Sequence, residues 1–178
     1  HPYGNPHYWL DPANGVPIAR AIRDGLTRVS PADAALFERR CADFEKRLAA
    51  AIARWNVQAR TLGLPGRKIV TYHRSWSYFV RAFGLEVVDF IEPRPGIPPS
   101  PNHVQDLVTR LKQGEVTLLI MEDFFDARLP EKLSRGTGIP LVVLPTSVKA
   151  DEKIVTYFDL FDRLLTSIGQ ATLKGGKP

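Results

Sequence analysis

Residues 68–91, KIVTYHRSWSYFVRAFGLEVVDFI, decide the fold class of this chain. Two short runs rich in β-branched residues, 68–72 and 86–91, have the composition of buried strands. Between them, the apolar residues of 76–83 recur at helical spacing, and Gly84 supplies a helix stop. A strand, a helix and a second strand in this order predict two parallel strands joined by a helical crossover.

The same alternation continues along the chain after an expected extended loop at 92–101, which holds five prolines in ten residues. Because strands alternate with helices, we predict an α/β fold with a parallel four-stranded sheet flanked by helices. The remaining strands are expected at 116–121 and 141–144, and the remaining helices at about 102–113, 130–135 and 155–173.

A long helix is expected before this region. Ser30-Pro31-Ala32-Asp33 has the residues of a helix start, and apolar residues then follow at intervals of three and four up to Leu62. Gly63 ends the pattern. At 1.5 Å per residue this helix would be roughly 48 Å long, more than a compact domain of this size needs for itself. We therefore expect it to run along, or between, two lobes, and to follow a shorter helix at 16–28.

The composition excludes several classes of protein. The 178 residues carry a modest formal net charge of +5, and basic side chains stand beside acidic ones, as in 38–47, so no nucleic-acid partner is expected. No glycine-rich phosphate-binding motif follows the expected strands, which argues against a nucleotide site. The longest uncharged apolar runs, such as 139–148, are far shorter than the roughly 20 residues of a membrane-spanning helix. The single cysteine, Cys41, falls on an apolar helix stripe and is expected to be buried.

Ligands of parallel sheets bind at the carboxyl ends of the strands, and His73 and Glu122 stand at two of these ends. His7 lies in a proline-rich loop near the start of the chain. Neutral imidazole is a common zinc ligand, but a lone histidine more often forms a structural hydrogen bond. No HExxH or CxxC motif is present, so spacing alone does not establish a metal site. For Glu122, helix capping and loop bracing are alternatives to metal binding.

Asn5-Pro6-His7-Tyr8-Trp9-Leu10-Asp11-Pro12 resembles the NPHxWLDP segment of the metal-binding lipoprotein family of ABC-transporter substrate-binding proteins, the solute receptors of zinc and manganese importers. The similarity extends in the same order over nearly the whole chain. It includes the long helix, the segment 71–79 followed by Phe83-Gly84-Leu85, Glu122 after a strand, Thr137-Gly138, and Tyr157 with the closing helix.

The resemblance implies two α/β lobes that are joined by one long helix and hold the metal in the cleft between them. Residues 1–29 would be the tail of the N-terminal lobe with a metal-ligand loop, and the chain, which starts at His1, looks like the interior of a longer protein. Residues 30–63 would be the inter-lobe helix, and residues 64–178 the C-terminal α/β lobe.

The resemblance also implies the ligands. His7 matches the family's ligand from the N-terminal lobe, and His73 matches the ligand at the first strand end of the other lobe. Histidine at this second position is associated with zinc and glutamate with manganese, so zinc is expected and manganese is the alternative. The family's earliest ligand would lie upstream of His1, and 144–147 lacks the aspartate that many members have there. Glu122 and His1 are therefore candidates for further ligands.

The function implied by the resemblance is non-catalytic. The protein would be periplasmic or otherwise extracytoplasmic, with a lipid anchor at an upstream N-terminus as one option, and would deliver zinc or manganese to an ABC permease in the membrane. One alternative is an isolated lobe or fragment that acts as a structural or interaction module without a competent metal site. Another is a metal-dependent hydrolase that uses His7, His73 and Glu122, although no motif pairs a base with a metal ligand.

Overall fold

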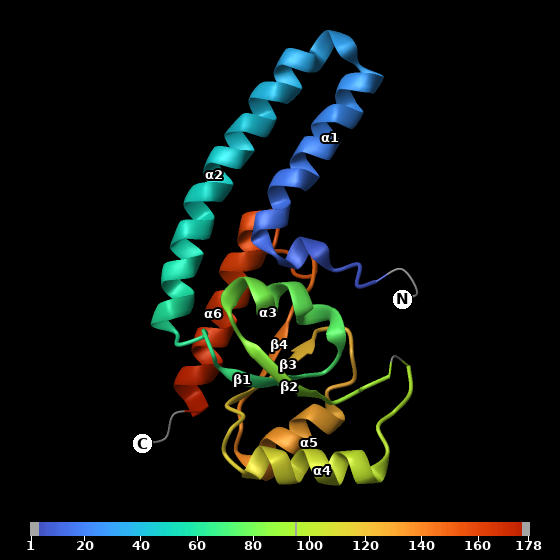
Figure 1. The fold of residues 1–178 in the computed structure, drawn as a ribbon, viewed down its shortest axis with the longest axis vertical. Helices are drawn as coiled ribbons and strands as arrows, with labels where there is room; N and C mark the ends of the chain where they lie inside the picture. Colours follow the sequence, from blue (N-terminus) through green and yellow to red (C-terminus); the bar gives the residue numbers. More distant parts are fainter. Residues whose placement is uncertain (1–3, 95, 176–178) are drawn as a thin grey trace.

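The structure, a computed structural model, describes residues 4–94 and 96–175. Its centre is a four-stranded sheet with strand order β2-β1-β3-β4, in which every pair of neighbours is parallel (Figure 1). The predicted α/β class and parallel four-stranded sheet are thus confirmed. The strands are β1 (Lys68–Thr71), β2 (Glu86–Phe90), β3 (Leu118–Glu122) and β4 (Leu141–Leu144).

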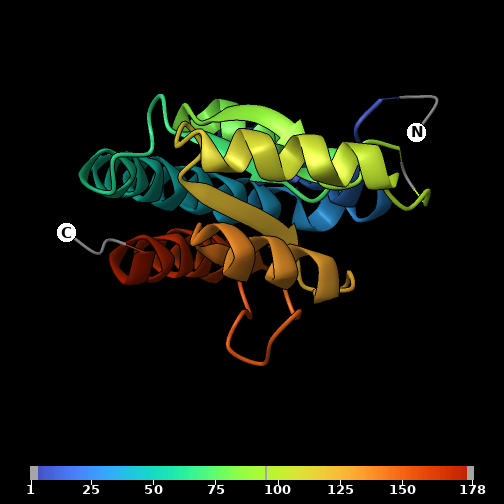
Figure 2. The ribbon, with the colours of Figure 1, turned by 90° about the horizontal axis from the view of Figure 1, so that it is seen from below.

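Helices cover both faces of the sheet, as Figures 1 and 2 show from two directions. On one face Val70 and Leu119 pack against α4 and α5, and on the other Ile69 and Leu118 pack with side chains of α2, α3 and α6. Adjacent residues of a strand thus belong to hydrophobic cores on opposite faces of the sheet, because successive side chains of a strand point to opposite faces. The helices are α1 (Gly15–Val29), α2 (Ala34–Thr61), α3 (Ser77–Phe83), α4 (Pro101–Lys112), α5 (Arg128–Thr137) and α6 (Tyr157–Gly175).

Two expected boundaries are corrected. The long helix begins at Ala34, because residues 31–33 form a 3₁₀ turn and the hydroxyl of Ser30 donates to the carboxylate of Asp33 (2.7 Å) without capping a backbone N–H. Strand β3 begins later than expected and includes Glu122, whose partner in β4 is Leu144. Ser100, by contrast, caps α4 as expected, since its hydroxyl accepts the backbone N–H of His103 (3.2 Å).

Helices α1 and α2 form an antiparallel hairpin that extends beyond the sheet (Figure 1). The base of α2 is fixed by Trp55, which is fully buried, contacts the ring of Phe161 (4.8 Å between centroids) and donates its indole N–H to Asp162 (2.6 Å). Gly15 is the one buried residue of α1. None of the helices in residues 4–94 and 96–175 combines the length and apolar character needed to cross a membrane.

Gly15 gives a test of how closely the hairpin approaches the body. A Cβ added there would lie 2.7 Å from Leu48 and 3.0 Å from Tyr157, so Gly15→Ala should lower the free energy of unfolding by about 1–3 kcal/mol through overpacking. Gly25→Ala is the matched control in the same helix, where the nearest atom is 3.8 Å away, and should raise it by about 0.5–1 kcal/mol. Urea denaturation measures both, and equal effects would contradict this packing.

Candidate metal site

A pocket of about 440 Å³ lies at the carboxyl ends of β1 and β3, where the N-terminal loop crosses the sheet edge. His7 and His73, which are 66 positions apart in the sequence, both line it. Its remaining lining residues are Gly4, Asn5, Arg74, Ser75, Phe124 and Phe125.

His73 is held by the turn that follows β1. The hydroxyl of Thr71 donates to the carbonyl of His73 (2.8 Å), and a 3₁₀ turn over Arg74–Trp76 follows at once. The Nδ1 atom of His73 is buried and has no hydrogen-bond partner among the described residues. Burial lowers the pKa of His73, against the opposing charge of Glu92, so its imidazole is neutral at pH 7 and keeps a lone pair for a ligand.

His7 is oriented by Asn5. The Oδ1 atom of Asn5 accepts the backbone N–H of His7 (3.0 Å) and lies 2.7 Å from its Nδ1, while the Nδ2 atom donates to the carbonyl of Arg74 (2.8 Å). Burial lowers the pKa of His7, and the nearby His73 lowers it further. Two neutral imidazoles therefore share one pocket at pH 7.

Two hydrogen bonds of Trp9 fix the loop that carries His7 to the α/β body. The indole of Trp9 donates to the carbonyl of Thr146 (2.7 Å), and the hydroxyl of Tyr157 donates to the carbonyl of Trp9 (2.6 Å). Within the N-terminal segment, the carboxylate of Asp11 accepts the backbone N–H of Ala13 (3.0 Å) and so caps the 3₁₀ turn Pro12–Asn14. The loop is thus tied to the end of β4 and the start of α6.

Glu122 lies at the same sheet edge but points into the core. It is fully buried, does not line the pocket, and neither carboxylate oxygen has a hydrogen-bond partner among the described residues, so the alternative of helix capping is wrong. Burial raises the pKa of Glu122, and the polar groups of Ser75 and Trp76 oppose the rise. His1 lies outside the described residues. Within these residues no three His, Cys, Asp or Glu side chains form a group that could hold a metal ion.

The structure adds residues that the sequence did not single out. Glu92 follows β2 at the same edge, is almost fully buried and accepts the backbone N–H of Gly96 (2.6 Å). Its negative charge acts to raise the pKa of His73. The strand-end rule that selected Glu122 could also have found Glu92. Phe125 stacks on Tyr72 (4.6 Å between centroids) beside the pocket, and no sequence signal indicated this.

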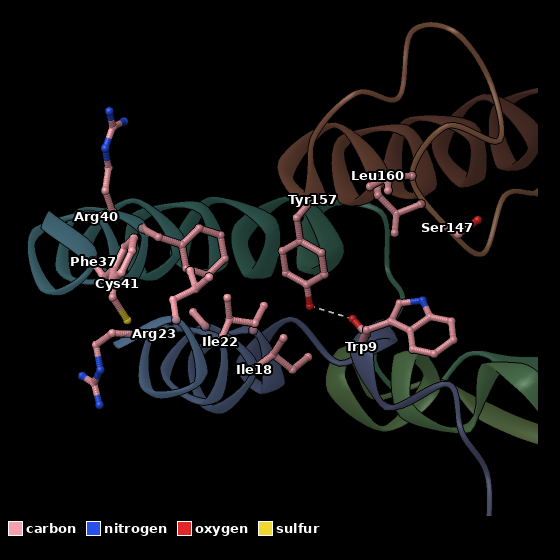
Figure 3. A pocket seen from close by; sticks show the side chains of 15 residues that line it. Trp9, Ile18, Ile22, Arg23, Phe37, Arg40, Cys41, Ser147, Tyr157 and Leu160 are labelled. Carbon is pink, nitrogen blue, oxygen red and sulfur yellow. Dashed lines mark hydrogen bonds between the residues drawn. The ribbon is translucent and has the colours of Figure 1, made fainter. Parts of the chain in front are cut away.

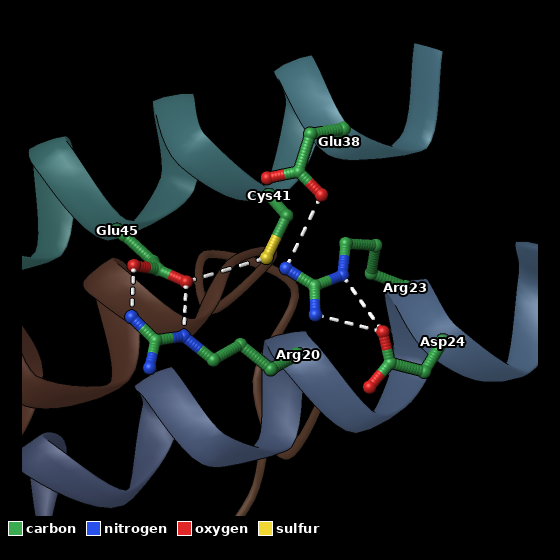
Figure 4. A network of polar contacts seen from close by, with 6 residues as sticks. All are labelled: Arg20, Arg23, Asp24, Glu38, Cys41 and Glu45. Atoms are coloured by element: carbon green, nitrogen blue, oxygen red, sulfur yellow. Dashed lines mark hydrogen bonds and ion pairs between the residues drawn. The ribbon is translucent and has the colours of Figure 1, made fainter. Parts of the chain in front are cut away.

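A second, apolar groove of about 530 Å³ lies between α1, α2 and the start of α6 (Figure 3). Its far end is joined by ion pairs between the helices: Arg20 binds Glu45 through two 2.8 Å contacts, and Arg23 approaches Glu38 at 3.2 Å (Figure 4). Cys41 lies among them and donates its thiol to Glu45 (3.5 Å). Burial and this carboxylate raise the pKa of Cys41, which agrees with the expected buried, unreactive thiol.

Comparisons with known proteins identify the family. The model of the family described as zinc-uptake complex component A, periplasmic (ZnuA), matches residues 1–171. The metal ABC transporter substrate-binding lipoprotein FimA of Streptococcus parasanguinis is 24% identical over 169 residues, which cover 93% of this chain and 55% of FimA. The high-affinity zinc uptake system protein ZnuA of Brucella abortus (strain 2308) is 26% identical over 131 residues, or 74% of this chain and 39% of that protein. The chain therefore spans about half the length of the curated relatives it matches.

A solved structure supports the same assignment. The substrate-binding protein FpvC from Pseudomonas aeruginosa, in complex with Mn²⁺, is 28% identical with a TM-score of 0.77, and the match covers 97% of this chain and 62% of that chain. The fold, the order of the motifs and the family match over 1–171 agree, and the chain belongs to the ZnuA family of metal-binding substrate-binding proteins.

Proposed function

We propose that this chain is the larger part of an extracytoplasmic solute-binding protein that captures zinc and delivers it to an ABC permease. The observation that carries the proposal is the presence of His7 and His73 in one pocket at the carboxyl ends of a parallel sheet. Manganese is the alternative cargo. The family consists of substrate-binding transport proteins and not of enzymes, so capture involves no chemical conversion.

The donor atoms favour zinc. Two neutral imidazoles are softer ligands than carboxylates, and imidazole suits zinc, whereas manganese prefers oxygen ligands. The relatives include proteins named for either metal: PsaA of Streptococcus pneumoniae is named as a manganese transporter component, and ZnuA of Brucella abortus as a zinc uptake protein. Glu122 and His1 stay predictions as further ligands, and Glu122 would have to turn out of the core to reach the pocket.

We propose further that residues 1–29 and the long helix within 30–63 connect the lobe formed by 64–178 to a second lobe. In support, the groove along α1 and α2 is apolar, and side chains such as Ile22 and Leu26 are exposed on the hairpin. This chain covers 55% of FimA and 62% of the FpvC structure, so such proteins have additional polypeptide that could bury this face. The lobe that packs there would also stand beside the pocket of His7.

Removing either imidazole should abolish tight zinc binding. Because loss of an outer-shell partner alone costs 10–100-fold, we expect His7→Ala and His73→Ala each to weaken the zinc Kd by more than about 100-fold. His103→Ala is the matched control, since the Nε2 atom of His103 contacts the carbonyl of Phe90 (2.8 Å) outside the pocket. Chelator competition on the natural polypeptide measures the Kd. Unchanged affinity in both pocket variants would refute the site, and no binding by the unaltered protein would favour the module alternative.

Zinc affinity should depend on pH in one direction. Burial lowers the pKa of both histidines below 6.5, so the neutral, ligand-competent forms dominate at pH 7 and above. The affinity should therefore be nearly flat above about pH 6.5 and fall below it, by up to about two orders of magnitude per pH unit if both imidazoles bind. Titrations between pH 5 and 8 in a non-coordinating buffer test this, and an affinity that rises as the pH falls would contradict it.

Covering of the hairpin can be tested by thiol labelling. In this chain Ile22 is 57% exposed in the groove and Val57 is 56% exposed elsewhere on α2, so the two positions are matched in exposure. In the natural polypeptide, the thiol of the Ile22→Cys variant should react with a maleimide at least about tenfold more slowly than that of the Val57→Cys variant. The reason is that the covering lobe must first move away from the groove by local opening. Both substitutions are made with Cys41→Ser, and equal rates would show that nothing covers this face.

A further inference from the structure

Asn5 has two contacts that no other residue of the pocket combines in the described part of the chain. Its Oδ1 atom accepts the backbone N–H of His7 (3.0 Å), and its Nδ2 atom donates to the carbonyl of Arg74 (2.8 Å). A carbonyl accepts only and a backbone N–H donates only, so these two bonds fix which end of the amide is oxygen. The oxygen therefore faces His7.

This assignment decides the tautomer of His7. The Nδ1 atom of His7 lies 2.7 Å from Oδ1 of Asn5, and because an amide oxygen can only accept, Nδ1 must carry the proton. In a neutral imidazole the other nitrogen, Nε2, then holds the lone pair that can bind a metal ion. The contact thus selects the ring nitrogen that is available to the pocket.

The second contact joins the two halves of the site. Arg74 follows His73 directly, and the bond from Asn5 to its carbonyl links segments that are 69 positions apart in the sequence. The carbonyl of His73 is itself held by Thr71 (2.8 Å). The spacing of the two histidine loops is therefore set before any ligand arrives, which lowers the ordering cost of binding.

We propose that Asn5 is a positioning residue for metal capture: it holds His7 in the Nδ1–H tautomer and clamps the His7 loop to the His73 loop. This inference rests on the proposed function for its effect on affinity, but the tautomer and the clamp are properties of the protein without metal. An alanine at this position supplies neither contact, and an aspartate would lack the donor that Arg74 requires.

Two measurements on Asn5→Ala test the proposal, with Asn14→Ala as the matched control. Asn14 donates to the carbonyl of Tyr8 (2.8 Å) in the same loop but does not line the pocket. We expect Asn5→Ala to weaken the zinc Kd by about 10–100-fold, as outer-shell substitutions do, and Asn14→Ala to change it by less than about threefold. Equal affinity of the Asn5→Ala variant and the unaltered protein would overturn the role in capture.

The second measurement does not need metal. In ¹⁵N spectra of the metal-free protein at pH 8, His7 should show the Nδ1–H tautomer, and this preference should be lost in Asn5→Ala but kept in Asn14→Ala. An Nε2–H tautomer in the unaltered protein would overturn the proposal even if zinc binds. If zinc does not bind at all, the proposed function fails, while the tautomer spectra still decide whether Asn5 orients His7.

Discussion

The arrangement of the site depends on two hydrogen bonds at Trp9. The hydroxyl of Tyr157 donates to the carbonyl of Trp9 (2.6 Å), and the indole of Trp9 donates to the carbonyl of Thr146 (2.7 Å). One short loop is thus held by two residues that lie 148 and 137 positions further along the sequence. Both bonds lie in partly buried surroundings, where a lost partner costs about 1–3 kcal/mol. The contact of Asn5 with Arg74, the ion pair of Asp11 with Arg81 (3.2 Å) and the fully buried side chain of Leu10 also tie the turn at 5–12 to the body.

The pocket presents two neutral imidazoles in a surrounding that disfavours charge. Burial lowers the pKa of both histidines, and Glu92 partly offsets this at His73. If the pocket captures a metal ion as we propose, the imidazoles need not first lose a proton at pH 7, and protons would compete with the metal only under acid conditions. Glu122 stands at the same edge, buried and without a hydrogen-bond partner among the described residues, and burial raises its pKa by disfavouring the charged form.

The helical hairpin divides into two parts with different chemistry. Near the sheet, Gly15 allows α1 to approach α2 and α6 closely, and the contact is apolar. Further out, the hairpin is joined by Arg20 and Glu45, and this pair holds the pKa of Glu45 at about 2. The groove between these parts is apolar and open in this chain, which is why we propose that a further lobe packs there.

The sequence by itself determined the order of strands and helices and the parallel sheet, because hydrophobic periodicity is a local property of the chain. It selected His73 as a candidate by its strand-end position and His7 by the motif around it. The start of α2 was misplaced, since the hydroxyl of Ser30 pairs with a side chain instead of a backbone N–H. Only the tertiary structure decided that Glu122 faces the core and that Asn5 bridges the two histidine loops. Such facts depend on contacts between segments far apart in the sequence, 69 positions in the case of Asn5 and Arg74, and no local pattern encodes which side chain will fill a given space between packed elements.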